Sequence, residues 1–352
     1  LFKKILSLLE LPESTFENKI AEYYTQISTD KDFILLDNGK LDLRVNHKSS
    51  SNIDEDEEDD EDLEEELPEE EYKKQWESGQ HQSDYNSCRF AEDKLEYGKQ
   101  WFRRYAPWIN FDNPKNIADR IANCKLYDMN PLKPKWADKI CSHWNLYEAG
   151  MEELAIEPVY YTHCYLTDYD WSYNIKNAAP QGKYILKMNH GSGWNMRFTR
   201  SDDFDPTYMQ QKVWEWYNLN FAYIAGWEWQ YDKIQPGFVI QPDLGELMNW
   251  EFWCEEGKIV AVNLVRKVSK NREDNVAWVD ENGDKPPFII AQPSQFFLSK
   301  SQKEILEKMK PYVKKLAEPF KFVRVDLYSI NGEPKFSELT FTPCAGRIRL
   351  GA

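Results

Sequence analysis

The segment 323–340 constrains the fold and chemistry of this chain more than any other. Two runs of alternating apolar and polar residues are separated by Asn331-Gly332, and this pattern predicts a β-hairpin. Arg324 and Asp326 fall on one side of the first strand. The other side is apolar and is expected to face a core, through Val323, Val325 and Leu327.

The register of this hairpin decides whether it can bind a metal ion. If the loop has three residues, with a bulge at the glycine, Asp326 lies opposite Glu338 and Arg324 lies opposite Thr340. A two-residue turn would instead place Ser337 opposite Asp326 and spoil the site. Carboxylates that face each other at about 5 Å repel, and Mg²⁺, which takes oxygen ligands, would stabilise them. At this point both registers remain open.

A second motif lies at residues 184–193. A predicted strand, Tyr184–Met188, carries Lys187 near its end and leads into a glycine-containing loop, Asn189–Gly193. Glycines let successive backbone N–H groups converge on an anion, and a lysine adds a point charge. The loop is not a Walker motif, because GxxxxGK[ST] is absent. Taken alone, a Gly-Ser-Gly sequence is most often an ordinary turn.

Three further pieces are ambiguous when each is taken singly. An apolar strand stops at Gln241-Pro242-Asp243; its end could read an adenine edge and hold ribose hydroxyls, but it also fits a core strand that enters a turn. Lys139 would ordinarily be a surface lysine. Arg266 follows the predicted strand 259–265 and is either a substrate clamp or simply exposed. The histidines have no metal-ligand spacing, and His190 is of interest because it lies in the glycine loop.

Composition narrows the class of protein. The net charge of −16 comes almost entirely from residues 54–71, where 15 of 18 residues are acidic. Such a run is self-repelling and is expected to be a disordered linker, or else an interaction tail for a basic partner. Six scattered cysteines without CxxC spacing predict reduced thiols in the cytoplasm. No apolar run of about 18 residues occurs, so no membrane span is expected, and no nucleic-acid partner is expected either.

The chain divides into five predicted segments. Residues 1–53 form a helix and hairpin segment, with a short amphipathic helix at 1–11 and a turn at Asn38-Gly39. Residues 54–88 form the acidic linker. Helical and mixed structure follows over 89–183, then a small lobe over 184–245 and a C-terminal lobe over 246–352. Further expected elements are helices at 206–222 and at 299–318, the latter opened by Ser299, and two strands joined at Glu256-Gly257.

The order of these pieces resembles the ATP-grasp superfamily, and more narrowly the TupA-like ATP-grasp family, which is named for teichuronopeptide biosynthesis. The resemblance covers about residues 105–346. It is carried by NFDNPKNIADRIANCKLYDMNPLKPKWADK (110–139), YILKMNHGSG (184–193), NWEFWCEEGKI (249–259) and FVRVDLYSINGEPKFSELTFTPCAG (322–346). It implies an α+β ATP-grasp fold in which two lobes clasp ATP, with a helical N-terminal extension. It also implies an ATP-dependent carboxylate–amine ligase that works through an acyl phosphate on an amino acid, peptide or acidic glycan.

The resemblance also implies roles for particular residues. Lys139 and Lys187 would contact the ATP phosphates. A mobile loop would fold over these phosphates, formed by Asn189, His190, Gly191, Ser192 and Gly193. Gln241 would belong to the adenine-binding segment, where an acidic residue is common in the family, and Asp243 or Glu251 would hold the ribose.

The remaining implied roles concern the reacting groups. Asp326 and Glu338 would bind Mg²⁺, together with Thr340 where the superfamily usually has Asn. Arg324 would steady the transferred phosphoryl group. Arg266 is a candidate catalytic residue because of its position after a strand, and not through the resemblance. Phosphoryl transfer needs positioning and charge neutralisation more than covalent help, so this set is chemically sufficient.

Two other functions fit the same resemblance. One is a kinase-like ATP-grasp enzyme that stops at phosphorylation. The other is a scaffold that kept the fold and lost catalysis. The intact set of Lys187, Arg324, Asp326 and Glu338 argues against the scaffold, because a degenerate member is expected to lose at least one of them.

Overall fold

The computed structural model describes residues 33–35, 41–43, 80–163, 174–245, 247–267, 273–290 and 292–351. The chain forms two compact units, Leu1–Glu64 and Glu65–Ala352. In the first unit, β1 (Phe33–Leu35) and β2 (Leu41–Leu43) pair in antiparallel fashion, which agrees with the predicted hairpin. The predicted helix at 1–11, the turn at Asn38-Gly39 and the acidic run at 54–71 lie outside the described residues.

The described part of the second unit starts with helices. These are α4 (Gln80–Phe90), α5 (Lys94–Tyr105), α6 (Ile117–Tyr127), α7 (Leu132–Ala137) and α8 (Cys141–Glu148), followed by the 3₁₀ helix η2 (Glu152–Leu154). The acidic linker predicted to reach residue 88 therefore overlaps α4. Its last residues are helical because Tyr85 and Cys88 are apolar side chains that become buried, which a solvated linker would not allow.

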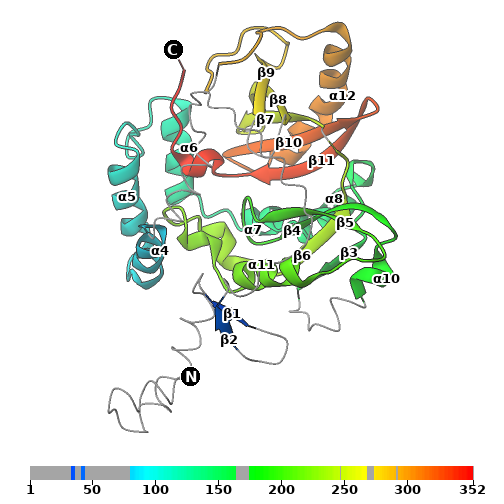
Figure 1. The fold of residues 1–352 in the computed structure, drawn as a ribbon. Coiled ribbons are helices and arrows are strands. Elements are labelled where there is room, and N and C mark those ends of the chain that lie inside the picture. Colours follow the sequence, from blue (N-terminus) through cyan, green and yellow to red (C-terminus); the bar gives the residue numbers. More distant parts are fainter. Residues whose placement is uncertain are drawn as a thin grey trace, which may run out of the picture. The chain divides into compact units, whose positions relative to one another are not determined.

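A four-stranded antiparallel sheet forms the small lobe (Figure 1). Its order is β3-β6-β4-β5, comprising β3 (Tyr160–Thr162), β6 (Phe238–Pro242), β4 (Gly182–Met188) and β5 (Asn195–Arg200). Helix α11 (Thr207–Tyr217) packs Met209 and Val213 against Leu186 and Met188 on one face of this sheet. Because strand side chains alternate, Lys187 and Gln241 lie on the opposite face.

Short elements complete the small lobe. They are α10 (Lys176–Ala178), η4 (Phe221–Tyr223) and η5 (Trp229–Lys233). The helix predicted over 206–222 therefore ends earlier, at Tyr217, and the chain continues as the separate 3₁₀ helix η4. Asn220 caps η4 by accepting a hydrogen bond from the Ala222 N–H, and such a side chain favours a new start over helix continuation.

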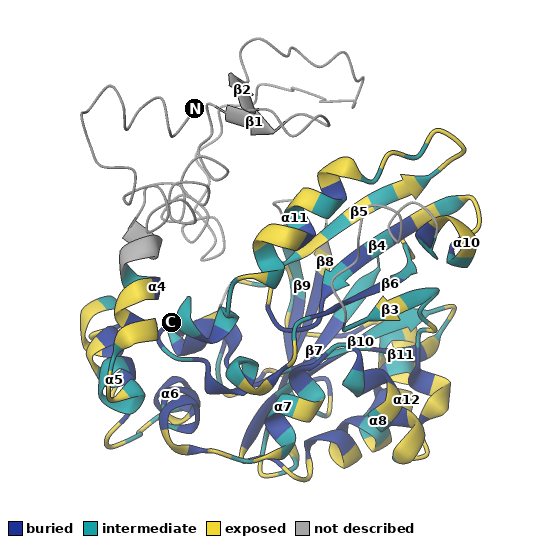
Figure 2. Ribbon diagram, turned by 90° about the horizontal axis from the view of Figure 1, so that it is seen from below, coloured by how far each residue is buried: buried dark blue, intermediate teal, exposed yellow. Residues whose placement is uncertain are grey.

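A five-stranded antiparallel sheet forms the C-terminal lobe, with the order β11-β10-β7-β8-β9. Its strands are β7 (Met248–Glu255), β8 (Lys258–Lys267), β9 (Glu273–Val279), β10 (Phe322–Ile330) and β11 (Glu333–Thr340). Helix α12 (Lys300–Ala317) begins after Ser299, which forms a capping box with Gln302. This helix covers one face of the sheet, and its exposed residues lie on its outer side (Figure 2). The 3₁₀ helix η6 (Pro343–Gly346) follows β11.

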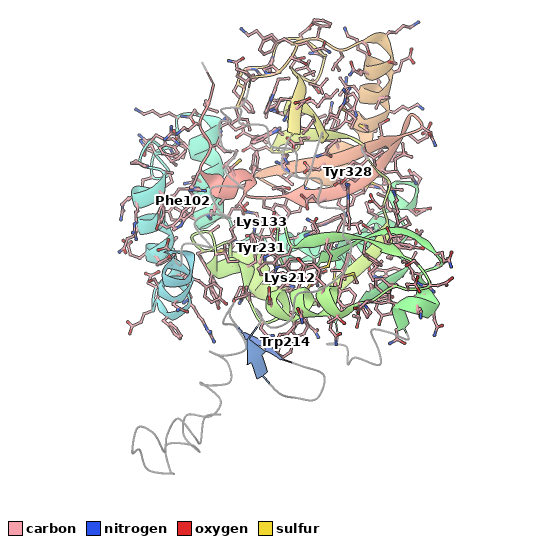
Figure 3. The ribbon with its side chains drawn as sticks, in the orientation of Figure 1. Phe102, Lys133, Lys212, Trp214, Tyr231 and Tyr328 are labelled. Carbon is pink, nitrogen blue, oxygen red and sulfur yellow. The ribbon has the colours of Figure 1, made fainter. Side chains whose placement is uncertain are left out.

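The hairpin β10–β11 has the register that a metal site needs, but for a different reason than expected. Ile330 pairs with Glu333, so the turn has two residues, Asn331 and Gly332, not three. A bulge at Ser337 then shifts the pairing, so that Asp326 lies opposite Glu338 and Arg324 lies opposite Thr340. An extra residue in one strand of a ladder has this effect. Tyr328, labelled in Figure 3, lies on the same face of β10 as Asp326.

Candidate active site

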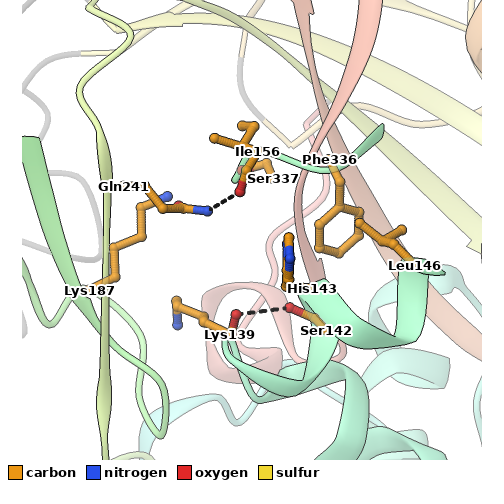
Figure 4. A pocket seen from close by; sticks show the side chains of 9 residues that line it. All are labelled: Lys139, Ser142, His143, Leu146, Ile156, Lys187, Gln241, Phe336 and Ser337. Carbon is orange, nitrogen blue, oxygen red and sulfur yellow. Dashed lines mark hydrogen bonds between the residues drawn. The ribbon is translucent and has the colours of Figure 1, made fainter. Parts of the chain in front are cut away.

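A pocket lies where the small-lobe sheet faces the start of α8 and strand β11 (Figure 4). Three of the predicted ATP ligands meet in it: Lys139 from the turn before α8, Lys187 from β4 and Gln241 from β6. The rest of the lining combines polar and apolar side chains, namely Ser142, His143, Leu146, Ile156, Phe336 and Ser337. Two cations beside apolar side chains suit a ligand that has an anionic part and a flat apolar part.

The two lysines of this pocket have perturbed acidity. Burial lowers the pKa of Lys187 to about 8; repulsion from Lys139 and Arg197 adds to the shift, and Glu338 partly offsets it. Burial also lowers the pKa of Lys139, again against the attraction of Glu338. The shared influence of Glu338 means that strand β11 brings a carboxylate within electrostatic range of both lysines. The end of the pocket that carries the two lysines, which would suit a phosphate, is therefore next to the hairpin.

The glycine loop is anchored at its base. Asn189 donates hydrogen bonds to Asp138 Oδ1 (3.1 Å) and to the Gln235 carbonyl (2.9 Å). His190 is only 2% exposed, and its Nε2 bonds the Trp216 carbonyl at 3.1 Å. Burial lowers the pKa of His190 to about 4, so its ring is neutral at pH 7. In this structure both side chains therefore have protein partners, whereas ATP contacts were predicted for them.

The tip of the glycine loop is different from its base. Ser192 and Gly193 are exposed, and Gly193 has a φ of 71° that favours glycine. Lys139 Nζ donates to the Gly191 carbonyl at 2.6 Å. The loop can therefore approach a phosphate only through its tip, while Lys139 ties it to the pocket.

Replacing Gly191 tests whether the anchored base positions this loop. An added Cβ would lie 2.5 Å from the Trp194 ring and 3.0 Å from the Phe221 ring. Because such overpacking must displace the neighbouring rings, we expect Gly191→Ala to lower the unfolding free energy by about 1–3 kcal/mol. Thermal denaturation measures this change, with Ser192→Ala at the exposed tip as the control. Equal melting temperatures for both variants would contradict the packed arrangement.

Acidic residues from three adjacent strands form a row on the polar face of the large sheet. Asp326 of β10 pairs with Glu251 of β7 on one side and with Glu338 of β11 on the other. Arg324 binds Asp326 through both carboxylate oxygen atoms, at 2.8 and 2.6 Å. It also lies 3.6 Å from Glu251 and donates to the Thr340 hydroxyl at 3.4 Å. One guanidinium thus balances three carboxylates.

The electrostatics of this row suit a divalent cation. Asp326 is 1% exposed. Burial raises its pKa well above the usual range, and Glu251 and Glu338 add to this shift against the attraction of Arg324. Within the described part of the chain, no group of three His, Cys, Asp or Glu side chains is placed to hold a metal. Asp326 and Glu338 supply hard oxygen donors, and Mg²⁺ often uses only two carboxylates together with substrate phosphates. The donor set therefore fits.

Other predicted site residues lie elsewhere. Asp243 forms an ion pair with Arg197 (3.3 Å) on the same face of the small sheet as Gln241. Glu251, proposed above as a ribose ligand, belongs to the carboxylate row instead. Arg266 is exposed and is three positions from Asn263, which bonds Glu251. By strand alternation it lies on the opposite face of β8. The structure does not bring Arg266 to the pocket.

Several residues near the site were not predicted from the sequence. Arg197 of β5 is close enough to influence both Lys187 and Tyr328. His143 lines the pocket and lies 3.4 Å from Glu157, and Phe336 forms part of the apolar wall. The alternation of residues 195–200 could have assigned Arg197 to a strand face, but only the pairing of β5 with β4 shows which face that is.

The fold and the site together define an ATP-grasp protein: α+β lobes with two antiparallel sheets, a strand lysine before a glycine loop, and an Arg-x-Asp/Glu-x-Thr hairpin. Residues 161–350, more than half of the chain, match the TupA-like ATP-grasp family model. The chain belongs to this family, as its sequence motifs suggested.

Comparison with solved structures finds ATP-grasp ligases of low identity. The L-amino acid ligase from Bacillus licheniformis is 12% identical with a TM-score of 0.39, and the match covers 70% of this chain and 55% of that one. The D-alanine–D-alanine ligase from Bacillus anthracis is 16% identical (TM-score 0.34; 59% and 57% covered). The ATP-grasp ligase PsnB with its minimal precursor is 11% identical (0.34; 65% and 62%).

In all three of these structures the match spans less than two thirds of the relative's length. No curated protein matches this chain. Of the helices that the structure describes, none has the length and apolar character needed to cross a membrane.

Proposed function

We propose that this chain is an ATP-dependent carboxylate–amine ligase that forms an amide through an acyl-phosphate intermediate. The observation that carries the proposal is the position of Glu338. Its carboxylate acts on both pocket lysines and also lies beside Asp326 in the hairpin. One strand thus joins a cationic, partly apolar pocket to a carboxylate row that fits Mg²⁺. A site that binds a nucleoside triphosphate together with a metal ion needs both the cationic pocket and the carboxylates.

The proposed roles follow from position and charge. Lys139 and Lys187 would hold phosphate oxygen atoms, with the exposed loop tip Ser192-Gly193 above them. Gln241, whose side-chain amide now donates to the Ile156 carbonyl at 3.0 Å, lies where the strand end would meet adenine. Asp243 is the remaining candidate for the ribose. Phe336 provides an apolar surface under a flat base.

The reacting groups would lie at the hairpin. Asp326, Glu338 and Thr340 would hold Mg²⁺, which when bound would neutralise charge on the phosphate oxygen atoms. Arg324 would release one carboxylate contact and move toward the transferred phosphoryl group. A carboxylate oxygen of the substrate attacks the γ-phosphorus, and the bond to ADP breaks. The amine nitrogen then attacks the acyl carbon, inorganic phosphate leaves, and the nitrogen loses a proton.

The class of substrate is also part of the proposal. We propose carboxylate and amine partners among amino acids, peptides or acidic glycans, and no nucleic acid. A cytoplasmic location is also proposed, because six scattered cysteines without CxxC spacing suit a reducing compartment. Binding of a basic partner to the acidic run 54–71 remains a prediction.

Isotope transfer tests the reaction directly. The purified chain is incubated with Mg²⁺, ATP and panels of ¹⁸O-carboxylate amino acids and uronic acids, each with a panel of amines. We expect release of ADP, an amide product by mass spectrometry, and one ¹⁸O atom in the inorganic phosphate, because the acyl phosphate passes that oxygen to the leaving group. A phosphorylated product without an amide would favour the kinase-like alternative. Asp326→Asn serves as the inactive control.

A further inference from the structure

A buried polar cluster lies directly beyond the metal-binding strand and takes no part in the roles proposed above. Thr342, two residues after Thr340, donates its hydroxyl hydrogen bond to the Glu228 carboxylate. Gln230 approaches both partners at 3.4 Å. Glu228 is 5% exposed and Thr342 is also buried. Bulk water therefore cannot replace the hydrogen bond between them.

Lys125 of α6 provides a second connection between the segment that contains Glu228 and the turn that contains Thr342. Its ammonium donates to the Ala225 carbonyl and, at 2.8 Å, to the Ala345 carbonyl. It also lies 4.3 Å from the centre of the Trp101 ring, a cation–π distance. Burial lowers the pKa of Lys125 to about 8, and Glu228 partly offsets this shift. The residues 225–230 are thus linked to the turn 342–346 at two points.

Both linked segments have a strained backbone. Cys344 and Ala345 have φ values of 51° and 54°, and Trp227 has a φ of 69°. Non-glycine residues in this left-handed region are strained and persist only where their surroundings hold them. The polar cross-links join these two strained segments to each other.

The same segment also lies within electrostatic range of Glu338 and Arg324. Tyr231 follows Gln230. Burial raises the pKa of Tyr231 well above its usual value, Glu228 and Glu338 add to this shift, and Arg324 opposes it. The Tyr231 ring packs edge-on against Phe221, with ring centres 4.9 Å apart. Phe221 packs against Trp194, which directly follows the glycine loop, at 5.2 Å. Residues 221–231 therefore lie between the glycine loop and the carboxylate row.

We infer that Glu228 and Thr342 are positioning residues that fix the end of β11, and thereby hold Glu338 and Thr340 where Mg²⁺ is bound with ATP. This inference rests on the proposed function for the identity of the metal ligands. It assigns no catalytic contact to Glu228 or Thr342. Their effect is expected in the binding of Mg·ATP and not in the binding of ATP alone, which depends on Lys139 before α8 and Lys187 of β4.

A matched pair of variants tests the inference. Thr342→Val keeps the shape of the side chain and removes the hydroxyl, whereas Thr342→Ser keeps the hydroxyl. Calorimetry measures the ratio of ATP affinities with and without Mg²⁺. Because a hydrogen bond to a charged group is lost, we expect Thr342→Val to reduce this ratio about tenfold. Thr342→Ser should retain the wild-type ratio. A role in stability alone would lower the melting temperature and leave the ratio unchanged.

A second measurement reports on the turn itself. Hydrogen exchange at residues 342–347 should become about tenfold faster in Thr342→Val and remain slow in Thr342→Ser. Glu228→Gln, which keeps an acceptor oxygen, should resemble the serine variant. If Mg²⁺ strengthens ATP binding in the wild type and equally in Thr342→Val, the inference is overturned while the proposed function stands. If Mg²⁺ has no effect in the wild type, both are overturned.

Discussion

Asp326→Asn should reduce Mg²⁺-dependent ATP turnover by about three orders of magnitude. Asp326 is the central member of the carboxylate row, with Glu251 and Glu338 as its neighbours on the adjacent strands. The amide has nearly the same shape but carries no charge, so it cannot compensate a divalent cation in a buried site. Removing a preorganised electrostatic group of this kind typically costs about 10²–10³ in rate, and loss of the metal costs more.

Folding should survive this substitution. Asparagine keeps one carbonyl oxygen for Arg324, which now binds both oxygen atoms of Asp326. The substitution weakens the ion pair with Arg324, which destabilises the fold. It also removes a buried carboxylate whose pKa is raised by burial and by the two flanking glutamates, and this stabilises the fold. We therefore expect a small net change in the free energy of unfolding, to be checked by chemical denaturation.

The measurement is ADP release at saturating ATP over a range of Mg²⁺ concentrations. Asp284→Asn, an exposed position after β9 at the far edge of the sheet, provides the control and should behave as the wild type. Unchanged turnover in Asp326→Asn with an intact fold would remove the metal assignment.

Local patterns in the sequence predicted much of the fold. The alternation around Asn331-Gly332 and the turn at Glu256-Gly257 both predicted hairpins that the structure contains, because such turns need residues that accept positive φ. The capping role of Ser299 was likewise readable from the residues that follow it. These signals depend only on neighbours along the chain.

What the sequence could not predict depends on contacts between distant segments. A bulge at Ser337 shifts the register of β10–β11 so that Asp326 lies opposite Glu338. Nothing in the local residue pattern distinguishes such a bulge from a longer loop. His190 is of interest in the sequence because it lies in the glycine loop, and no local signal indicates that its Nε2 bonds the carbonyl of Trp216. Arg197 reaches the site only through the pairing of β5 with β4. Tertiary packing decides each of these features.

Lys187→Met should weaken ATP binding by about two orders of magnitude or more. Lys187 lines the pocket in a partly buried position, and a phosphate would pair there with a cation in a low-dielectric environment, where one charge contact contributes strongly. Methionine preserves the apolar stem and removes the ammonium. Lys183→Met on the same strand is the matched control, because Lys183 is exposed. Calorimetric titration with ATP gives both affinities.

The pH dependence of binding separates charge from packing. Lys187 has a pKa of about 8, lowered from 10.5 chiefly by burial, so its ammonium is present below pH 8 and is lost above it. Since phosphate binds the charged form, ATP affinity should be flat below pH 8 and fall about tenfold per unit above it. Binding near pH 8.5 should also take up protons, which titrations in buffers of different ionisation enthalpy detect.

Because Lys139 is a second partly buried lysine in the pocket, the pH profile must be measured in both the wild type and Lys187→Met. The pKa of Lys139 is also lowered by burial, so it could contribute to the decline in affinity at high pH. In Lys187→Met the repulsion between the two lysines is gone, which should raise the pKa of Lys139 and move any remaining decline to higher pH. A profile in Lys187→Met that still turns down at pH 8 would assign the titration at pH 8 to a group other than Lys187.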